Sequence, residues 1–126
     1  MKTNVKIHLE DGEIEMKCEL MLMESTFVNL KEIFPTSIKT MLFEKKHASL
    51  QTQFNLTNVD KCWILLFDEN KEFVGVKPHF YKSEANYQVL ITEPYVLLLD
   101  EFNTFKFEDI ISFSISRVKG GNNELL

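Results

Sequence analysis

The stretch FNLTNVDKCWILLFDENKEFVGV, Phe54–Val76, is the part of the sequence that most directly predicts the fold. Its centre, Cys62–Phe67, is an unbroken apolar run, short enough to be a strand buried on both faces. The residues that follow, Asp68–Lys71, are typical of a turn because Asp and Asn side chains accept hydrogen bonds from the nearby backbone. Phe73–Val76 then returns as the partner strand. The stretch therefore predicts a β-hairpin in the core.

The return strand of this hairpin is expected at the edge of a sheet. Gly75 predicts a β-bulge, and Pro78 predicts a bend or an edge position because proline cannot donate a ladder hydrogen bond. Just beyond lies Pro78-His79-Phe80-Tyr81, whose two aromatic side chains we expect at the surface.

The N-terminal segment predicts a second hairpin around Asp11-Gly12, since glycine accepts the positive φ of a tight turn. Apolar residues alternate with polar ones on both sides of this pair: Val5, Ile7 and Leu9 before it, and Ile14, Met16, Cys18 and Leu20 after it. Such alternation is typical of an antiparallel ribbon with one face on the core and one in water.

The remaining segments are shorter or less clear. Ser25 or Thr26 is expected to cap a short helix that ends before Pro35, and Thr36-Ser37 could begin another helical turn. Further expectations are a loop at 45–48, strands at 50–56 and 87–91, a strand pair over 105–115 with a turn at Glu108-Asp109, and a flexible tail at 118–126. Residues 95–99 fit a helix after Pro94 as well as a buried strand.

Together these elements predict one domain over residues 1–117, of the α+β class and mainly β. We expect an antiparallel sheet or a barrel-like β domain of about seven to eight strands with one or two short helices. A chain of 126 residues is long enough to build one core. There is no apolar run of about 20 residues and no signal-peptide block, which predicts a cytoplasmic protein away from the membrane.

The distribution of charge bears on the class of partner. The formal net charge is −5 and Arg117 is the only arginine, so the sequence offers no basic stripe for nucleic acid. Carboxylates gather in one segment: Glu93, Asp100, Glu101, Glu108 and Asp109. If they share a face, that face could bind a basic partner protein; the alternative is a solvated face that keeps the protein soluble.

Catalytic and metal-binding patterns are missing from the sequence. Cys18 and Cys62 have no metal or redox spacing, and Lys61 beside Cys62 should point to the opposite face of the strand. The histidines, His8, His47 and His79, are scattered, lack metal-ligand spacing and are expected at the surface. We predict no catalytic residue, metal or cofactor; an enzyme that uses Cys62 or a carboxylate pair is the third of three hypotheses.

Several short motifs, in order, resemble a bacterial family known as domain of unknown function 192. They are Thr40–Phe43, Phe54–Asn58, Ile64–Asp68, Phe73–Val76, Tyr87–Leu90 and Phe107–Ile110. Phe54 and Asn58 match the family pattern, whereas Asn55 stands where the family has Trp and Thr57 where it has Lys. Cys62-Trp63-Ile64 replaces Pro-Leu-Asp. The resemblance implies a compact β-rich fold with short helices, and it supplies no function.

The first hypothesis for function is a non-enzymatic interaction module that uses the acidic region, with Asp100 and Glu101 as its test residues, or the edge near Pro78–Tyr81. The second is a small-ligand binder with a cavity at one end of the barrel, lined by Phe54, Asn58, Trp63 and Tyr87. We prefer the first, because catalytic spacings are missing from the sequence.

Overall fold

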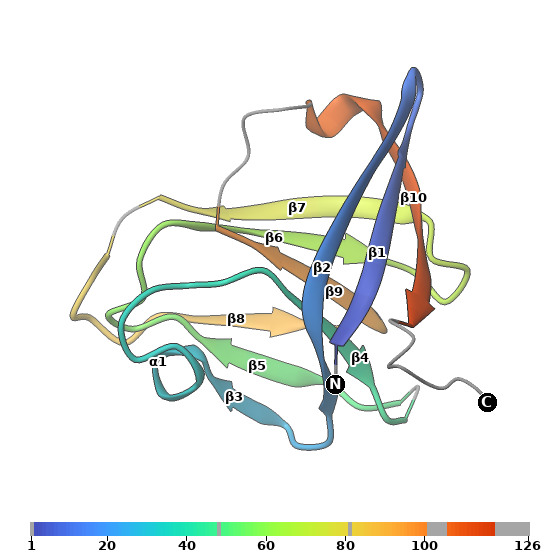
Figure 1. Cartoon of the computed structure of the whole chain (residues 1–126). Helices are drawn as coiled ribbons and strands as arrows, with labels where there is room; N and C mark the ends of the chain where they lie inside the picture. The colour runs from blue at the N-terminus through green and yellow to red at the C-terminus, as the bar shows by residue number, and fades with distance from the viewer. Residues whose placement is uncertain (1, 48, 81, 101–105, 118–126) are drawn as a thin grey trace.

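The computed structural model describes residues 2–47, 49–80, 82–100 and 106–117, and within these ranges the chain is mainly β (Figure 1). The strands are β1 (Lys2–Leu9), β2 (Gly12–Met23), β3 (Phe27–Asn29), β4 (Met41–Lys45), β5 (Thr52–Asn55), β6 (Cys62–Phe67), β7 (Phe73–His79), β8 (Gln88–Ile91), β9 (Tyr95–Leu99) and β10 (Ile110–Arg117). One short helix, α1 (Leu30–Ile33), and one 3-10 turn, η1 (Phe107–Asp109), complete the described elements.

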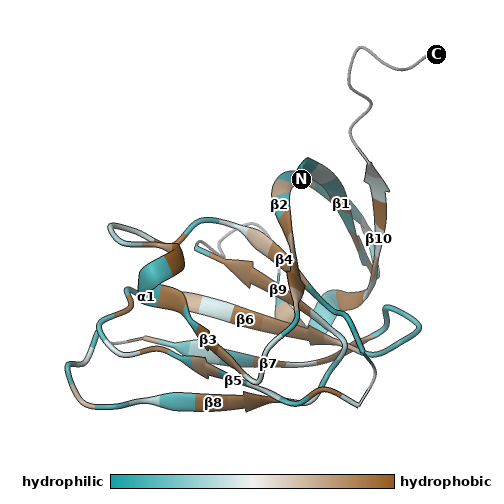
Figure 2. Ribbon diagram, turned by 90° about the horizontal axis from the view of Figure 1, so that it is seen from below, coloured by the Kyte–Doolittle hydropathy of each residue, from teal (hydrophilic) through white to brown (hydrophobic). Residues whose placement is uncertain are grey.

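The strands form two sheets. A 7-stranded sheet has the order β10-β1-β2-β4-β9-β6-β7, and a 3-stranded sheet has the order β3-β5-β8. The larger sheet curls into a half-barrel, so that its two edge strands approach each other: Glu72 bridges Ser112, and the Phe113 N–H donates to the Lys71 carbonyl at 3.0 Å. Figure 2 shows β1, β2 and β10 standing away from the layer formed by β3, β5 and β8.

Two apolar cores lie on opposite faces of the larger sheet. Alternation along β6 divides its side chains: Ile64 and Leu66 pack into the core between the two sheets, whereas Leu65 and Phe67 pack into the core inside the half-barrel. We call these the inter-sheet core and the half-barrel core. One core covers each face of β6 and β9, which explains their continuous apolar sequences.

Both predicted hairpins form, although Gly12 does not have the positive φ on which the first prediction rested. β1 and β2 pair antiparallel on either side of the Asp11-Gly12 turn, and β6 pairs antiparallel with β7. Pro78 lies on β7, which is an edge strand as expected. The bulge differs slightly from the expectation: Leu66 faces Gly75 and Phe67 faces Phe73, so the extra residue is Val74.

The prediction of an antiparallel sheet holds only in part, because both sheets are mixed. β2 runs parallel to β4, and β3 runs parallel to β5. The chain leaves β2, passes through β3 and α1, and re-enters the larger sheet in its original direction. The described residues form ten strands instead of the expected seven to eight, and two of them, Phe27–Asn29 and Met41–Lys45, were not predicted as strands.

The helical prediction after Ser25 is also corrected. Phe27–Asn29 is strand β3, which pairs with β5, and only Leu30–Ile33 is α-helical. The helix is capped by Asn29, whose side-chain oxygen accepts from the Lys31 N–H at 3.2 Å. Thr36-Ser37 begins no helix, and the strand that precedes the predicted 45–48 loop extends through Lys45.

Residues 95–99, which the sequence left open, form strand β9 between β4 and β6. In this position Val96–Leu99 bury both faces. The predicted 118–126 tail, Glu101 and Phe105 lie outside the described residues, and Phe107–Asp109 is the 3-10 turn η1 instead of the first strand of the pair predicted over 105–115. No helix in the described part of the chain is long and apolar enough to cross a membrane.

Candidate functional site

Two of the four residues predicted to line one ligand cavity, Phe54 and Trp63, lie on opposite faces of the larger sheet. Phe54 is fully buried in the inter-sheet core, where its ring lies edge-on to Phe43 with 5.1 Å between centroids. Trp63 is on the half-barrel side, and its ring meets those of Phe80 at 5.1 Å and Phe107 at 5.7 Å. Phe54 and Trp63 therefore cannot share a cavity.

Tyr87 and the predicted aromatic edge, in contrast, come together. Tyr87 stacks on His79 with 5.6 Å between ring centroids, and both residues line a cavity of about 380 Å³ with Pro78 and Phe80. His79 was expected at the surface but is 4% exposed, and its Nε2 lies 2.8 Å from the Val59 carbonyl oxygen. That contact requires a proton on Nε2, since the carbonyl can only accept.

Asn58 lies in the loop after β5 and contacts a residue that lines this cavity. Its φ of 61° is in the left-handed region, which Asn adopts more readily than most residues. Its backbone N–H donates to the Ser83 carbonyl at 2.7 Å, and Ser83 lines the same cavity as Tyr87. Asn58 thus shapes the loops around Tyr87 through its backbone.

Two carboxylates of the acidic segment, Glu93 and Asp100, lie just before and just after strand β9, and Glu108 and Asp109 lie in η1. Asp100 is exposed and accepts from the Thr40 hydroxyl at 3.4 Å. Glu93 lies near Lys45: burial lowers the pKa of that amine, and the Glu93 charge offsets part of the effect. Glu101 lies outside the described residues.

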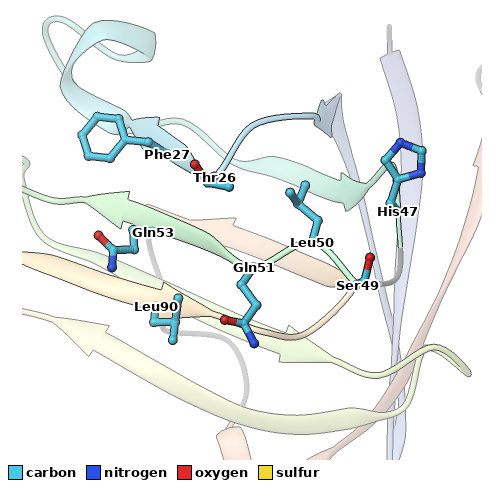
Figure 3. Close-up of a pocket in the computed structure, with 8 residues that line it drawn as sticks. All are labelled: Thr26, Phe27, His47, Ser49, Leu50, Gln51, Gln53 and Leu90. Atoms are coloured by element: carbon cyan, nitrogen blue, oxygen red, sulfur yellow. The ribbon is translucent and has the colours of Figure 1, made fainter.

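The outer face of the smaller sheet carries an uncharged patch that the sequence did not reveal. The strand register places Phe27 beside Gln53 and Gln53 beside Leu90, one residue from each strand. Phe27 and Leu90 are 45% and 47% exposed. Figure 3 shows these three side chains with Gln51 and Leu50 around a cavity of about 720 Å³, whose lining includes no Asp, Glu, Lys or Arg.

Among the described residues, β8 pairs only with β5, so its other side is an open edge of the smaller sheet. The Tyr87 carbonyl accepts from the Leu56 N–H at 2.8 Å. Antiparallel strands alternate the direction of their backbone groups, so Val89 and Ile91 also face β5, whereas Gln88 and Leu90 point their N–H and C=O groups away from it.

Other edges of the fold carry protective features that β8 lacks. β7 has Lys77, Pro78 and the bulge at Val74, and its far end meets β10. β3 is only 3 residues long. Charges, proline, bulges and shortness all discourage a further strand from adding to an edge. Gln88–Ile91 has no charge and no proline, and in this it resembles the inner strands β5 and β6, so the sequence gives no signal that it lies at an edge.

The cysteines have the properties of core residues. Burial raises the pKa of the Cys62 thiol to about 12, and burial is also the largest cause of the raised pKa of Cys18. Both thiols are therefore protonated at neutral pH, whereas a nucleophilic cysteine must be a thiolate. Among the described residues, no group of three or more His, Cys, Asp and Glu side chains is placed to hold a metal ion.

No protein-family model matches the chain, and no curated protein matches it. The resemblance to domain of unknown function 192 thus stays a prediction. Among solved structures, a "putative transcription regulator" from Sinorhizobium meliloti 1021 is 13% identical, with a TM-score of 0.65 over 93% of this chain and 94% of that chain. A protein of unknown function from Novosphingobium aromaticivorans DSM 12444 is 12% identical, with a TM-score of 0.62 over 90% and 83% of the two chains. Likeness at such low identity shows a shared fold alone.

Proposed function

We propose that the protein is a non-enzymatic interaction module that binds an extended segment of a partner protein along β8. The observation that carries this proposal is the unprotected edge of β8, whose backbone groups at Gln88 and Leu90 point away from β5. An extended peptide can complete such an edge as an added strand, in which main-chain hydrogen bonds supply affinity and alternate side chains supply specificity.

Cavities at both ends of β8 support the same proposal. Leu90 borders the uncharged cavity on the outer sheet face, and Tyr87 borders the cavity formed with Pro78 and Phe80. A strand added to β8 would place alternate side chains beside Leu90 and Gln88 on the outer face. The exposed apolar and amide groups there favour a neutral segment with aliphatic or aromatic side chains.

The charge of the partner follows from this geometry. A basic partner was expected on the assumption of one acidic face, but Glu93 and Asp100 lie at opposite ends of β9. The patch beside β8 carries amide and apolar side chains instead. The proposed partner segment is therefore recognised by shape and backbone pairing, and its binding should depend only weakly on salt.

The test is a proline substitution at an outward-facing N–H. Peptides selected from a displayed random library are titrated into the wild type and the Leu90→Pro variant by calorimetry. Leu90→Pro removes a donor that β5 does not use, so the fold should persist while peptide affinity falls at least tenfold. Leu90→Ala keeps the donor and trims only the side chain, and Ile111→Ala trims an exposed side chain on another strand.

We expect the wild type and Ile111→Ala to bind the peptides equally tightly, Leu90→Ala to bind them more weakly, and Leu90→Pro to bind them most weakly. Peptides that bind Leu90→Pro as tightly as the wild type would show that they attach elsewhere. A library that yields no binder to the wild type would also count against the proposal.

A further inference from the structure

A separate cavity of about 370 Å³ lies where the β1–β2 hairpin meets the segment that links α1 to β4. On β2, Met21 and Met23 point into the inter-sheet core, and by alternation Lys17 and Glu19 continue the same face beyond the end of that core. Ile33, Phe34 and Met41 close the core from the other side. The cavity is therefore a pocket at the end of the inter-sheet core, with an apolar floor and a polar rim.

The rim concentrates positive charge in an otherwise acidic protein. Lys2, Lys17 and Lys39 line the cavity with a single carboxylate, Glu19, which lies 3.3 Å from the Lys2 amine. No carboxylate of the described residues forms an ion pair with Lys17 or Lys39. The local balance is thus positive while the whole chain has a net charge of −5. A cleft lined by one sign of charge raises the local concentration of ligands of the opposite sign.

Hydroxyl groups on the same rim add directional hydrogen-bond donors. Thr36, Ser37 and Thr40 all line the cavity, and Thr36 and Ser37 are exposed. The Thr40 hydroxyl lies 3.4 Å from an Asp100 oxygen, at the limit of a hydrogen bond. Lysine amines and hydroxyls are donors suited to a carboxylate or phosphate oxygen, and small-molecule pockets typically combine a few such groups with an apolar wall.

We propose that this cavity binds a small organic anion, a carboxylate or phosphate monoester with an apolar body. The anionic group lies between Lys17 and Lys39, and the apolar body lies on Phe34 and Met41. The volume of the cavity falls in the range of about 300–1,000 Å³ that is typical of ligand sites. This site is distinct from the β8 edge, and neither proposal depends on the other.

Phenyl phosphate is the probe for this site, followed by NMR amide shifts and calorimetry. We expect saturable binding, with shifts concentrated at Thr36, Ser37 and Thr40, and a weaker affinity as sodium chloride is raised. Inorganic phosphate lacks the apolar body and benzyl alcohol lacks the charge, so each should bind at least fivefold more weakly. Equal binding of benzyl alcohol and phenyl phosphate would overturn the anionic character of the site.

The variants locate the site. The double variant Lys17→Ala/Lys39→Ala should weaken phenyl phosphate binding about tenfold, because two nearby charges are lost. Lys6→Ala is the matched control: Lys6 lies on the same hairpin but does not line the cavity. Both lysines in the double variant are exposed, so thermal unfolding should be unchanged.

Unchanged affinity in the double variant, or no saturable binding to the wild type, would overturn this proposal. Leu90→Pro should leave phenyl phosphate binding intact, so failure here is distinguishable from failure of the interaction proposal.

Discussion

Phe54 and Phe27 lie on neighbouring strands but have opposite surroundings. Phe54 is fully buried against Phe43, and Phe27 is 45% exposed on the outer sheet face. The alternation of side chains along β5 and the register with β3 produce this difference. At the scale of the residue, burial decides whether an aromatic ring stabilises the fold or is available to a partner.

We expect Phe54→Ala to lower the free energy of unfolding by about 3–5 kcal/mol, because it leaves a cavity in the inter-sheet core. Phe27→Ala should lower it by less than about 1 kcal/mol. Urea denaturation followed by Trp63 fluorescence measures both. A cost for Phe54→Ala near that of Phe27→Ala would contradict the assignment of Phe54 to the core.

The buried Cys62 thiol makes the free energy of unfolding depend on pH in the alkaline range. Burial raises its pKa from 9.0 to about 12, so the folded state keeps a proton that the unfolded chain loses above its own pKa. This contribution to stability is present below about pH 9 and is lost as the pH rises towards 12. We expect the wild type to lose about 1 kcal/mol more than Cys62→Ala between pH 8 and 10.

Parallel urea titrations of the two proteins at pH 8 and pH 10 measure this difference. Cys62→Ala also pays a packing cost, but that cost is independent of pH and cancels in the comparison. Identical pH dependence in the two proteins would mean that the thiol ionises normally in the folded state.

At the scale of the element, β8 and β9 show how position in a sheet governs backbone protection. β9 pairs with β4 on one side and with β6 on the other, whereas β8 pairs with β5 alone among the described strands. An amide that points away from its only neighbour needs no unfolding to exchange its hydrogen.

We therefore expect the Leu90 amide to exchange within minutes at neutral pH, while the Leu97 amide exchanges only through global unfolding. Hydrogen exchange followed by NMR resolves the two residues. Strong protection at Leu90 in the isolated protein would mean that the edge of β8 is already covered, for example by a second copy of the chain.

At the scale of the whole molecule, the curl of the larger sheet places residues together that are distant in the sequence. The contact between β7 and β10 partly closes the half-barrel, and the smaller sheet covers the outer face of β4, β9 and β6. The β8 edge and the lysine-rimmed cavity lie outside these packed regions. Both proposed binding sites are thus places where the packing of the two sheets ends.

Part of the candidate site could be read from the sequence. Tyr87 and the edge Pro78–Tyr81 were proposed separately as binding residues, and the fold brings Tyr87 to one cavity with Pro78, His79 and Phe80, while Tyr81 lies outside the described residues. Phe54 and Trp63 were predicted to line one cavity at the end of the barrel, but they pack into cores on opposite faces of the larger sheet. When both faces of a strand are buried, the sequence does not show into which of the two cores a given side chain packs.

Local patterns were enough to predict the two hairpins, the edge position of Pro78 and the mainly β character, because alternation and turn residues act over a few neighbouring positions. The parallel pairing of β2 with β4 and of β3 with β5, the burial of His79, and the placement of Lys17 and Lys39 around one cavity could be seen only in the folded chain. These features depend on contacts between segments that are distant in the chain. There, strand order and register follow from the packing of one apolar core on each face of the larger sheet.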